Sequence, residues 1–179
     1  WDDRSGKNDK GSYGNRGERY LAAVAYLDGP DANPSAVFVR GYYTYAYLWA
    51  VTFDGKEIKD NWYHSSHSKT QYKLTDAEGK TTTHSAKNPT RGSGSRTMYG
   101  NGNHNLSVGD VDGDGADEIV WGSAALDNDG MLLYATGFGH GDAMHLADHN
   151  PDRPGLEVFQ VHEGSPYGWD LHDAATGEI

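Results

Sequence analysis

Two histidines of this 179-residue chain, His104 and His140, each follow a glycine-rich turn. Glycine lets the backbone approach a ligand closely, and imidazole nitrogens bind divalent cations together with carboxylate oxygens. Asp142 and Glu163 are candidate carboxylates for such a site. We therefore predict that these four residues bind a divalent cation. The alternative is coincidence, because nine histidines in a polar chain will place two on one face without any ligand.

The most specific motif is an acidic loop at residues 110–118, which we call the first acidic loop. Its acidic side chains alternate with glycine, a pattern that suits a hard cation with six to eight oxygen ligands. The predicted Ca²⁺ ligands are Asp110, Asp112, Asp114, the carbonyl oxygen of Ala116, and Glu118. No helical pattern flanks the loop, so we predict that the ion stabilises a turn between two strands and exclude an EF-hand. A solvated acidic turn is the alternative.

A second acidic loop at residues 148–157 repeats the theme with prolines interleaved. Asp148, Asn150 and Glu157 are its predicted metal ligands. Its spacing is less regular than that of the first acidic loop, so a solvated turn is an equal alternative here.

These side chains need a scaffold that brings distant segments together, and an internal repeat indicates its form. Three segments each contain a short apolar stretch, an acidic turn and a second apolar stretch. The paired stretches are 21–28 with 36–41, 106–110 with 118–122, and 144–148 with 157–163. Asp148 follows Asp110 by 38 residues, and a period of about 40 residues made of short strands is typical of β-propeller blades.

We therefore predict an all-β fold, a fragment of a β-propeller with roughly four blades at about 45 residues a blade. Residues 1–179 would form part of one β-propeller catalytic domain, truncated at both ends. Further strands are expected at 46–53 and 169–171, each before a hairpin-type turn. The polar run at 65–97 is predicted to be a surface insertion, and a disordered loop is the alternative.

The predicted strand pairing places the histidines together. In each repeat the chain runs along one strand, turns at an acidic loop and returns antiparallel. His104, His140 and Glu163 then lie at the end of the strands opposite the acidic turns. We call His104, His140, Asp142 and Glu163 the rim cluster. Arg40 ends the matching strand of the first repeat and is expected beside them.

A family resemblance is carried by six runs of the sequence, 19–29, 40–44, 102–108, 110–119, 139–145 and 155–163. In these runs the chain closely resembles the rhamnogalacturonan lyases of polysaccharide lyase family 11. The resemblance covers most of the chain apart from about 65–97. It implies an eight-bladed β-propeller with several bound Ca²⁺ ions. The implied activity is β-elimination of the rhamnose–galacturonate bond in the pectic polysaccharide rhamnogalacturonan I.

By the same resemblance, the rim cluster corresponds to a calcium site in the active cleft. Mn²⁺ or another divalent ion is an alternative there, because Ca²⁺ prefers oxygen to imidazole. A galacturonate carboxylate would bind this cation, which stabilises the negative charge formed as C5 loses its proton. The residues predicted to be catalytic are His104, His140, Glu163 and Arg40. Predicted substrate contacts are Arg40, Tyr42 and Tyr43, with core packing as the alternative for the tyrosines.

Composition and charge narrow the expected partners. A net charge of −11 argues against nucleic acid, and no apolar run approaches the roughly 20 residues of a membrane span. The resemblance implies a pectic polysaccharide as substrate and a secreted, extracellular protein. A second chain that completes the ring is a further candidate partner.

Two other functions remain open at this stage. The first is a non-catalytic, calcium-stabilised propeller that binds a glycan or a protein. The second is a hydrolase, which usually needs paired carboxylates for acid and base catalysis. The general base of a lyase is expected outside this chain, with His145 as a candidate inside it.

Overall fold

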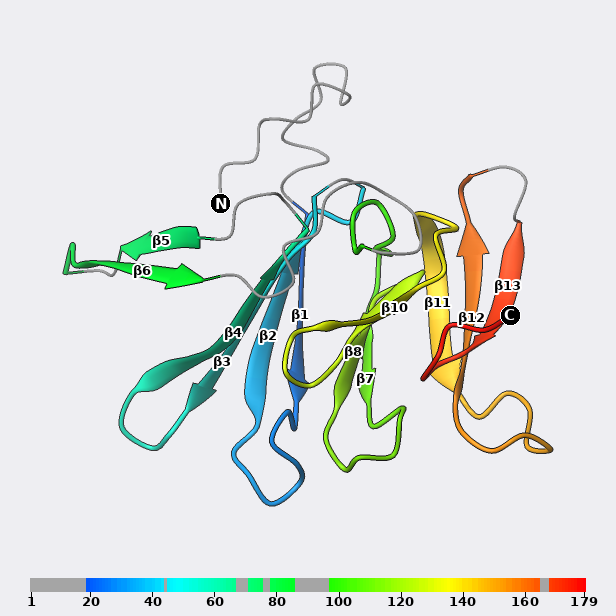
Figure 1. Ribbon diagram of the computed structural model, residues 1–179, viewed down its shortest axis with the longest axis horizontal. Helices are drawn as coiled ribbons and strands as arrows, with labels where there is room; N and C mark the ends of the chain where they lie inside the picture. The colour runs from blue at the N-terminus through cyan, green and yellow to red at the C-terminus, as the bar shows by residue number, and fades with distance from the viewer. Residues whose placement is uncertain (1–18, 44, 67–70, 76–77, 86–96, 165–167) are drawn as a thin grey trace.

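All regular structure that the computed structural model describes is β-strand (Figure 1). The structure describes residues 19–43, 45–66, 71–75, 78–85, 97–164 and 168–179. Within these ranges, no helix is long and apolar enough to cross a membrane. The strands form three antiparallel sheets and one separate hairpin, so the predicted all-β class is confirmed.

The first sheet contains four strands in chain order, β1 (Tyr20–Ala25), β2 (Ser35–Arg40), β3 (Tyr47–Phe53) and β4 (Ile58–Ser65). Side chains alternate between its two faces, as strand geometry requires. Val37 and Val39 are buried, whereas Phe38 between them is exposed. The strands predicted around 21–28, 36–41 and 46–53 are confirmed as β1 to β3.

The second sheet has the order β10-β9-β8-β7. Its strands are β7 (Ser107–Gly109), β8 (Glu118–Val120), β9 (Ala124–Leu126) and β10 (Leu132–Ala135). The third sheet contains β11 (Gly141–Ala147), β12 (Glu157–His162) and β13 (Trp169–Asp173) in that order. The predicted antiparallel pairs β7–β8 and β11–β12 are confirmed, and each encloses an acidic loop.

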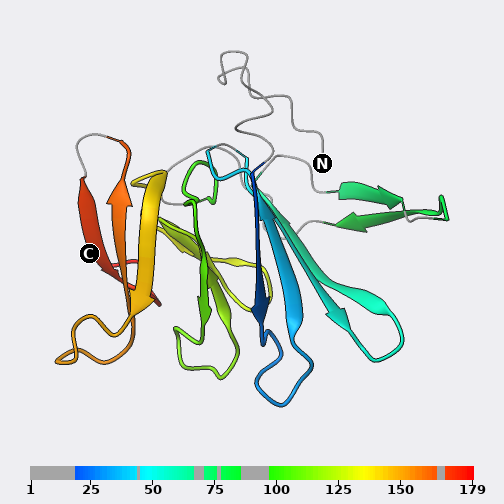
Figure 2. The same cartoon turned by 180° about the vertical axis from the view of Figure 1, so that it is seen from behind.

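The three sheets stand side by side, with β1, β7 and β11 next to one another (Figures 1 and 2). One core cluster packs the first sheet on the second and includes Leu27, Leu48 and Ile119. Another packs the second sheet on the third and includes Val120, Met144 and Val158. This arrangement resembles adjacent blades, but the described residues form three such sheets where roughly four were expected, and these sheets do not close into a ring. The predicted propeller is therefore not confirmed.

A two-stranded hairpin of β5 (Gln71–Thr75) and β6 (Thr81–Ser85) lies between the first and second sheets in the chain. It falls inside the predicted insertion at 65–97. Residues 67–70, 76–77 and 86–96 lie outside the described residues, so the insertion stays a prediction.

The acidic turns and the histidine-bearing segments lie at opposite ends of the strands. The β1–β2, β7–β8 and β11–β12 turns lie at the lower side in Figure 1. The segments that precede β7 and β11 lie at the upper side. This separation is the one that antiparallel pairing predicts.

Candidate metal centre

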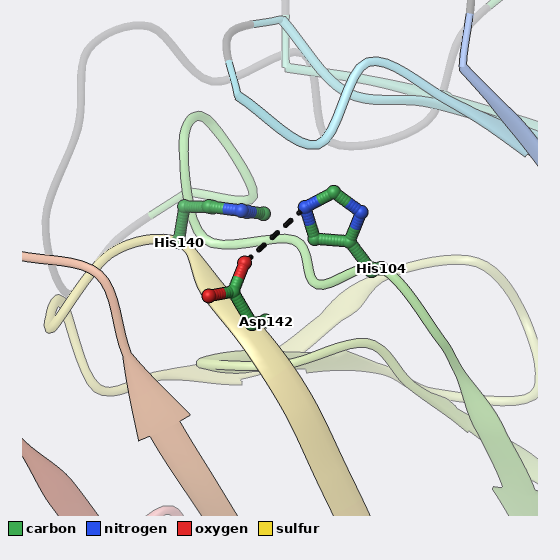
Figure 3. Close-up of side chains that lie close together, drawn as sticks. All are labelled: His104, His140 and Asp142. Carbon is green, nitrogen blue, oxygen red and sulfur yellow. Dashed lines mark ion pairs between the residues drawn. The ribbon is translucent and has the colours of Figure 1, made fainter.

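His104 and His140 come together at the upper rim although 36 residues separate them in the chain. Their ring centroids are 4.9 Å apart. Nitrogen atoms of both rings and a carboxylate oxygen of Asp142 all lie within 4.8 Å of one another. Figure 3 shows Asp142 on β11, facing both imidazoles. Three members of the rim cluster are therefore spaced for a shared cation.

Among the described residues, only one ring nitrogen of His140 has a hydrogen-bond partner. Its Nδ1 lies 2.7 Å from the carbonyl oxygen of Gly102 and donates to it, so Nε2 carries the lone pair. Nε2 is buried and has no hydrogen-bond partner among the described residues. The nearest carboxylate is that of Glu163, with Oε2 3.9 Å away. Burial lowers the pKa of His140, and the nearby His104 lowers it further, which favours the neutral imidazole that binds metals.

His104 has a partner at each ring nitrogen. The Tyr42 hydroxyl lies 3.2 Å from Nδ1, and the Tyr43 hydroxyl lies 3.0 Å from Nε2. Asp142 Oδ1 also approaches Nε2, at 3.5 Å. The Nε2 side of the ring therefore faces the other members of the rim cluster, whereas the Nδ1 side faces Tyr42.

Buried polar contacts join the two segments that carry the histidines. The Asn101 side chain accepts a hydrogen bond from the Gly139 amide at 3.1 Å. The Ser123 hydroxyl donates to the Gly139 carbonyl at 2.8 Å. Trp121 donates from its indole to the Asn103 carbonyl at 2.8 Å. These contacts fix the positions of both turns relative to the second sheet.

The predicted substrate residues occupy different environments. Arg40 is 3% exposed at the end of β2, with its guanidinium 5.7 Å from the centre of the Tyr47 ring. Tyr42 is also 3% exposed and packs in the main core cluster, which agrees with the core-packing alternative. Tyr43 is only partly buried. The roles of all three in binding substrate stay predictions.

The donor set of the rim cluster fits a divalent cation. Two imidazoles and the Asp142 carboxylate lie close together, whereas Glu163 is not part of this group and lies 3.9 Å from His140 Nε2. Among the described residues, no hydrogen-bond donor reaches the buried Nε2 lone pair of His140. Mixed nitrogen and oxygen ligands suit Mn²⁺ or Zn²⁺ better than Ca²⁺, which takes oxygen.

His145 is exposed on β11, and its carbonyl oxygen lies 3.3 Å from Nε2 of His149.

The first acidic loop gathers its side chains as predicted for a cation-binding turn. Carboxylate oxygens of Asp110, Asp112 and Glu118 lie within 4.8 Å of one another. A second group contains Asp112, Asp114 and Asp127. Asp127 precedes the β9–β10 turn and was not predicted, because its proximity to the loop depends on how β8 and β9 pair.

Glu118 is the buried carboxylate of this loop, and its surroundings are compatible with a nearby cation. The side chain is fully buried. Its Oε2 accepts from the Val111 amide at 2.8 Å, while Oε1 has no hydrogen-bond partner in the part of the chain that the structure describes. Burial, with further contributions from Asp112 and Asp114, raises the pKa of Glu118 to about 7. A bound cation would remove the cost of burying this charge. Ala116, which lies within the loop, is also buried.

The second acidic loop repeats only part of this arrangement. Oε2 of the buried Glu157 accepts from the amides of His149 and Asn150, at 2.9 and 3.1 Å. Its Oε1, like that of Glu118, has no hydrogen-bond partner within the described ranges. Among the described residues, Asp148 and Glu157 do not form part of a three-acid cluster. A metal at this loop therefore stays a prediction.

Repeated antiparallel sheets with an imidazole–carboxylate cluster at one rim define an all-β protein with a candidate cation centre. Residues 3–179 match the family described as "Rhamnogalacturonan lyase family 11, C-terminal domain". The chain belongs to this family of rhamnogalacturonan lyases.

Curated relatives support the same assignment. The chain is 48% identical over 169 residues to rhamnogalacturonan exolyase YesX of Bacillus subtilis (strain 168), covering 93% of this chain and 23% of that protein. It is 47% identical over 170 residues to rhamnogalacturonan endolyase YesW of the same organism, covering 94% of this chain and 23% of that protein. The chain thus spans about a quarter of the length of these relatives.

Solved structures show that the fold is shared as well. The crystal structure of exotype rhamnogalacturonan lyase YesX matches with a TM-score of 0.77 at 45% identity, over 100% of this chain and 26% of that one. The Bacillus licheniformis rhamnogalacturonan lyase matches with a TM-score of 0.73 at 48% identity, over 100% of this chain and 27% of that one.

Proposed function

We propose that this chain supplies the cation-binding part of a rhamnogalacturonan lyase that cleaves the rhamnose–galacturonate bond of rhamnogalacturonan I by β-elimination. The observation that carries the proposal is the meeting of His104, His140 and Asp142 at one rim, with ligand atoms within 4.8 Å. Membership of the lyase family agrees with it. The chain spans about a quarter of the length of its relatives, so the activity of the whole protein is part of the proposal.

The chemistry requires stabilisation of negative charge at the sugar acid. Removal of the C5 proton of galacturonate leaves an enolate-like carboxylate, and the C4–O4 bond then breaks to give an unsaturated uronate. A divalent cation supplies Lewis-acid stabilisation of that charge. The rim cluster would hold the cation, with His140 Nε2 and Asp142 as ligands oriented by the turns that carry them. Arg40 would add positive charge near the sugar carboxylate.

We propose a structural role for Ca²⁺ at the two acidic loops. Glu118 and Glu157 support this role, because both carboxylates are buried. Among the described residues, Oε1 of each has no hydrogen-bond partner. An ion at each turn would stabilise a β-hairpin without requiring side-chain packing there. Secretion and completion of an eight-bladed propeller by the rest of the protein, or by a second chain, belong to the same proposal.

A direct assay tests the proposed reaction. The full-length protein is incubated with rhamnogalacturonan I and Ca²⁺ or Mn²⁺, and absorbance of the unsaturated uronate is followed. The expected result is rising absorbance that stops when the cation is chelated. Retained glycan binding without any unsaturated product would favour a non-catalytic, glycan-binding propeller. Saturated products would instead indicate a hydrolase.

A further inference from the structure

We propose that the hydroxyl group of Tyr42 is a positioning group that holds His104 in the tautomer able to bind a cation through Nε2. This inference rests on the proposed function, in which the rim cluster binds a divalent cation. It assigns opposite effects to two adjacent tyrosines. Tyr42 supports cation binding, whereas the Tyr43 hydroxyl competes with it.

The two hydroxyls approach opposite nitrogens of the same ring. Tyr42 lies 3.2 Å from Nδ1, and Tyr43 lies 3.0 Å from Nε2. Only Nε2 faces the carboxylate of Asp142, at 3.5 Å. Nε2 is therefore the nitrogen placed to bind a cation shared with His140 and Asp142, and Nδ1 is the nitrogen that must carry the proton.

A neutral imidazole has one N–H donor and one lone pair. When a cation takes the lone pair of Nε2, the proton resides on Nδ1 and needs an acceptor. The Tyr42 hydroxyl oxygen is placed to accept that hydrogen bond. The same cation forces Nε2 to give up its hydrogen bond to Tyr43. In metal sites, the group that binds the second nitrogen of a ligating histidine fixes the tautomer and the ring orientation.

Packing prevents Tyr42 from moving away from this position. Its ring stacks on His140 at a centroid distance of 5.4 Å and an interplanar angle of 13°. It also meets the edge of Trp121 at 6.3 Å. Gly102 leaves room for this packing, because a Cβ there would lie 2.6 Å from Tyr42 Cβ. One buried ring thus contacts both histidines.

The test uses Mn²⁺ alone as the probe and the full-length protein. Free Mn²⁺ is measured by electron paramagnetic resonance during a titration, and His104→Ala identifies the class of sites that contains this residue. Tyr42→Phe, which removes only the hydroxyl, should weaken that class by about 10- to 100-fold. Tyr43→Phe, the matched control one residue away, should leave it equally tight or tighten it. Near-ultraviolet circular dichroism checks that both variants keep their packing.

Three results would overturn the inference. If Tyr42→Phe binds Mn²⁺ at this class as tightly as wild type, the hydroxyl has no positioning role. If Tyr43→Phe weakens binding at this class by about 10-fold or more, the two hydroxyls do not have opposite effects and each merely supports the local packing. The Tyr43→Phe result decides this point even if Tyr42→Phe folds poorly. If His104→Ala removes no class of Mn²⁺ sites, the proposed cation centre itself fails and the inference fails with it.

Discussion

The side chain of His140 donates a hydrogen bond from Nδ1 to the carbonyl oxygen of Gly102, across 2.7 Å. Gly102 lies two residues before His104, so this single bond joins the two turns that carry the histidines. It also fixes the proton of His140 on Nδ1 and leaves Nε2 directed towards Glu163 and Asp142. The protein itself therefore orients the His140 imidazole of the rim cluster, without the help of a bound ligand.

A methyl group at residue 102 should disrupt this arrangement. In Gly102→Ala, the added Cβ would lie 2.6 Å from Tyr42 Cβ and 2.8 Å from the Trp121 ring. Overpacking of this kind costs about 1–3 kcal/mol in the free energy of unfolding, which urea denaturation measures. Gly109→Ala is a matched control, because its Cβ would only touch Leu146 at 3.6 Å. Equal stability of the two variants would contradict the packing argument.

Loss of an imidazole from the rim cluster should lower turnover far more than it lowers the stability of the fold. Removing several kcal/mol of charge stabilisation lowers the rate roughly 100-fold or more. His104→Ala and His140→Ala are assayed by uronate absorbance in the full-length protein, with thermal unfolding measured alongside. His149→Ala is the control that should keep its activity, because His149 is an exposed histidine in the second acidic loop, at the end of the strands opposite the rim cluster. Full turnover in His104→Ala would refute the proposed chemistry.

Removal of a predicted ligand from the first acidic loop should chiefly lower the thermal stability of the protein. Asp112 belongs to both acidic groups of that loop. A ligand present at 100 times its Kd stabilises the folded state by about 2.7 kcal/mol, so Asp112→Ala should lose a Ca²⁺-dependent rise in Tm. Melting curves with Ca²⁺ and with chelator measure this. Glu57→Gln, an exposed acid in the β3–β4 turn, should retain the full Ca²⁺ response.

Mild acid should destabilise the fold through His64. This histidine is fully buried on β4, and its Nδ1 donates to the Gly130 carbonyl at 3.0 Å. Burial lowers its pKa from 6.5 to about 4. Between these values the unfolded chain binds the proton more tightly, so stability falls as pH drops below about 6.5. From pH 7.5 to 5 this linkage amounts to about 2 kcal/mol.

The contribution of His64 is isolated by comparison with a variant. The free energy of unfolding is measured for wild type and His64→Gln at pH 7.5 and 5, with Ca²⁺ held constant. Other titrating groups act equally in both proteins, so the difference in slope belongs to His64. Identical slopes would show that His64 does not titrate as its burial requires.

Sequence patterns were sufficient for features that are local in the chain. Strands β1, β2 and β7 were predictable because apolar stretches flank a contiguous acidic turn. The edge strand β4 was not predicted, since its first half is polar and exposed. The three-residue strand β9 is buried throughout, so it lacks the alternation that marks a half-buried strand.

The same distinction applies to the candidate site. The sequence by itself determined the first acidic loop, because its predicted ligands lie within nine consecutive residues and the backbone turn brings their side chains together. It also determined that His104 and His140 share one end of the strands, since antiparallel pairing fixes direction. Only the tertiary structure decided that Tyr42 reaches His104 across 62 residues and that Asp127 joins the acidic loop. Those contacts depend on how whole sheets pack against one another, and no local pattern of residues encodes that packing.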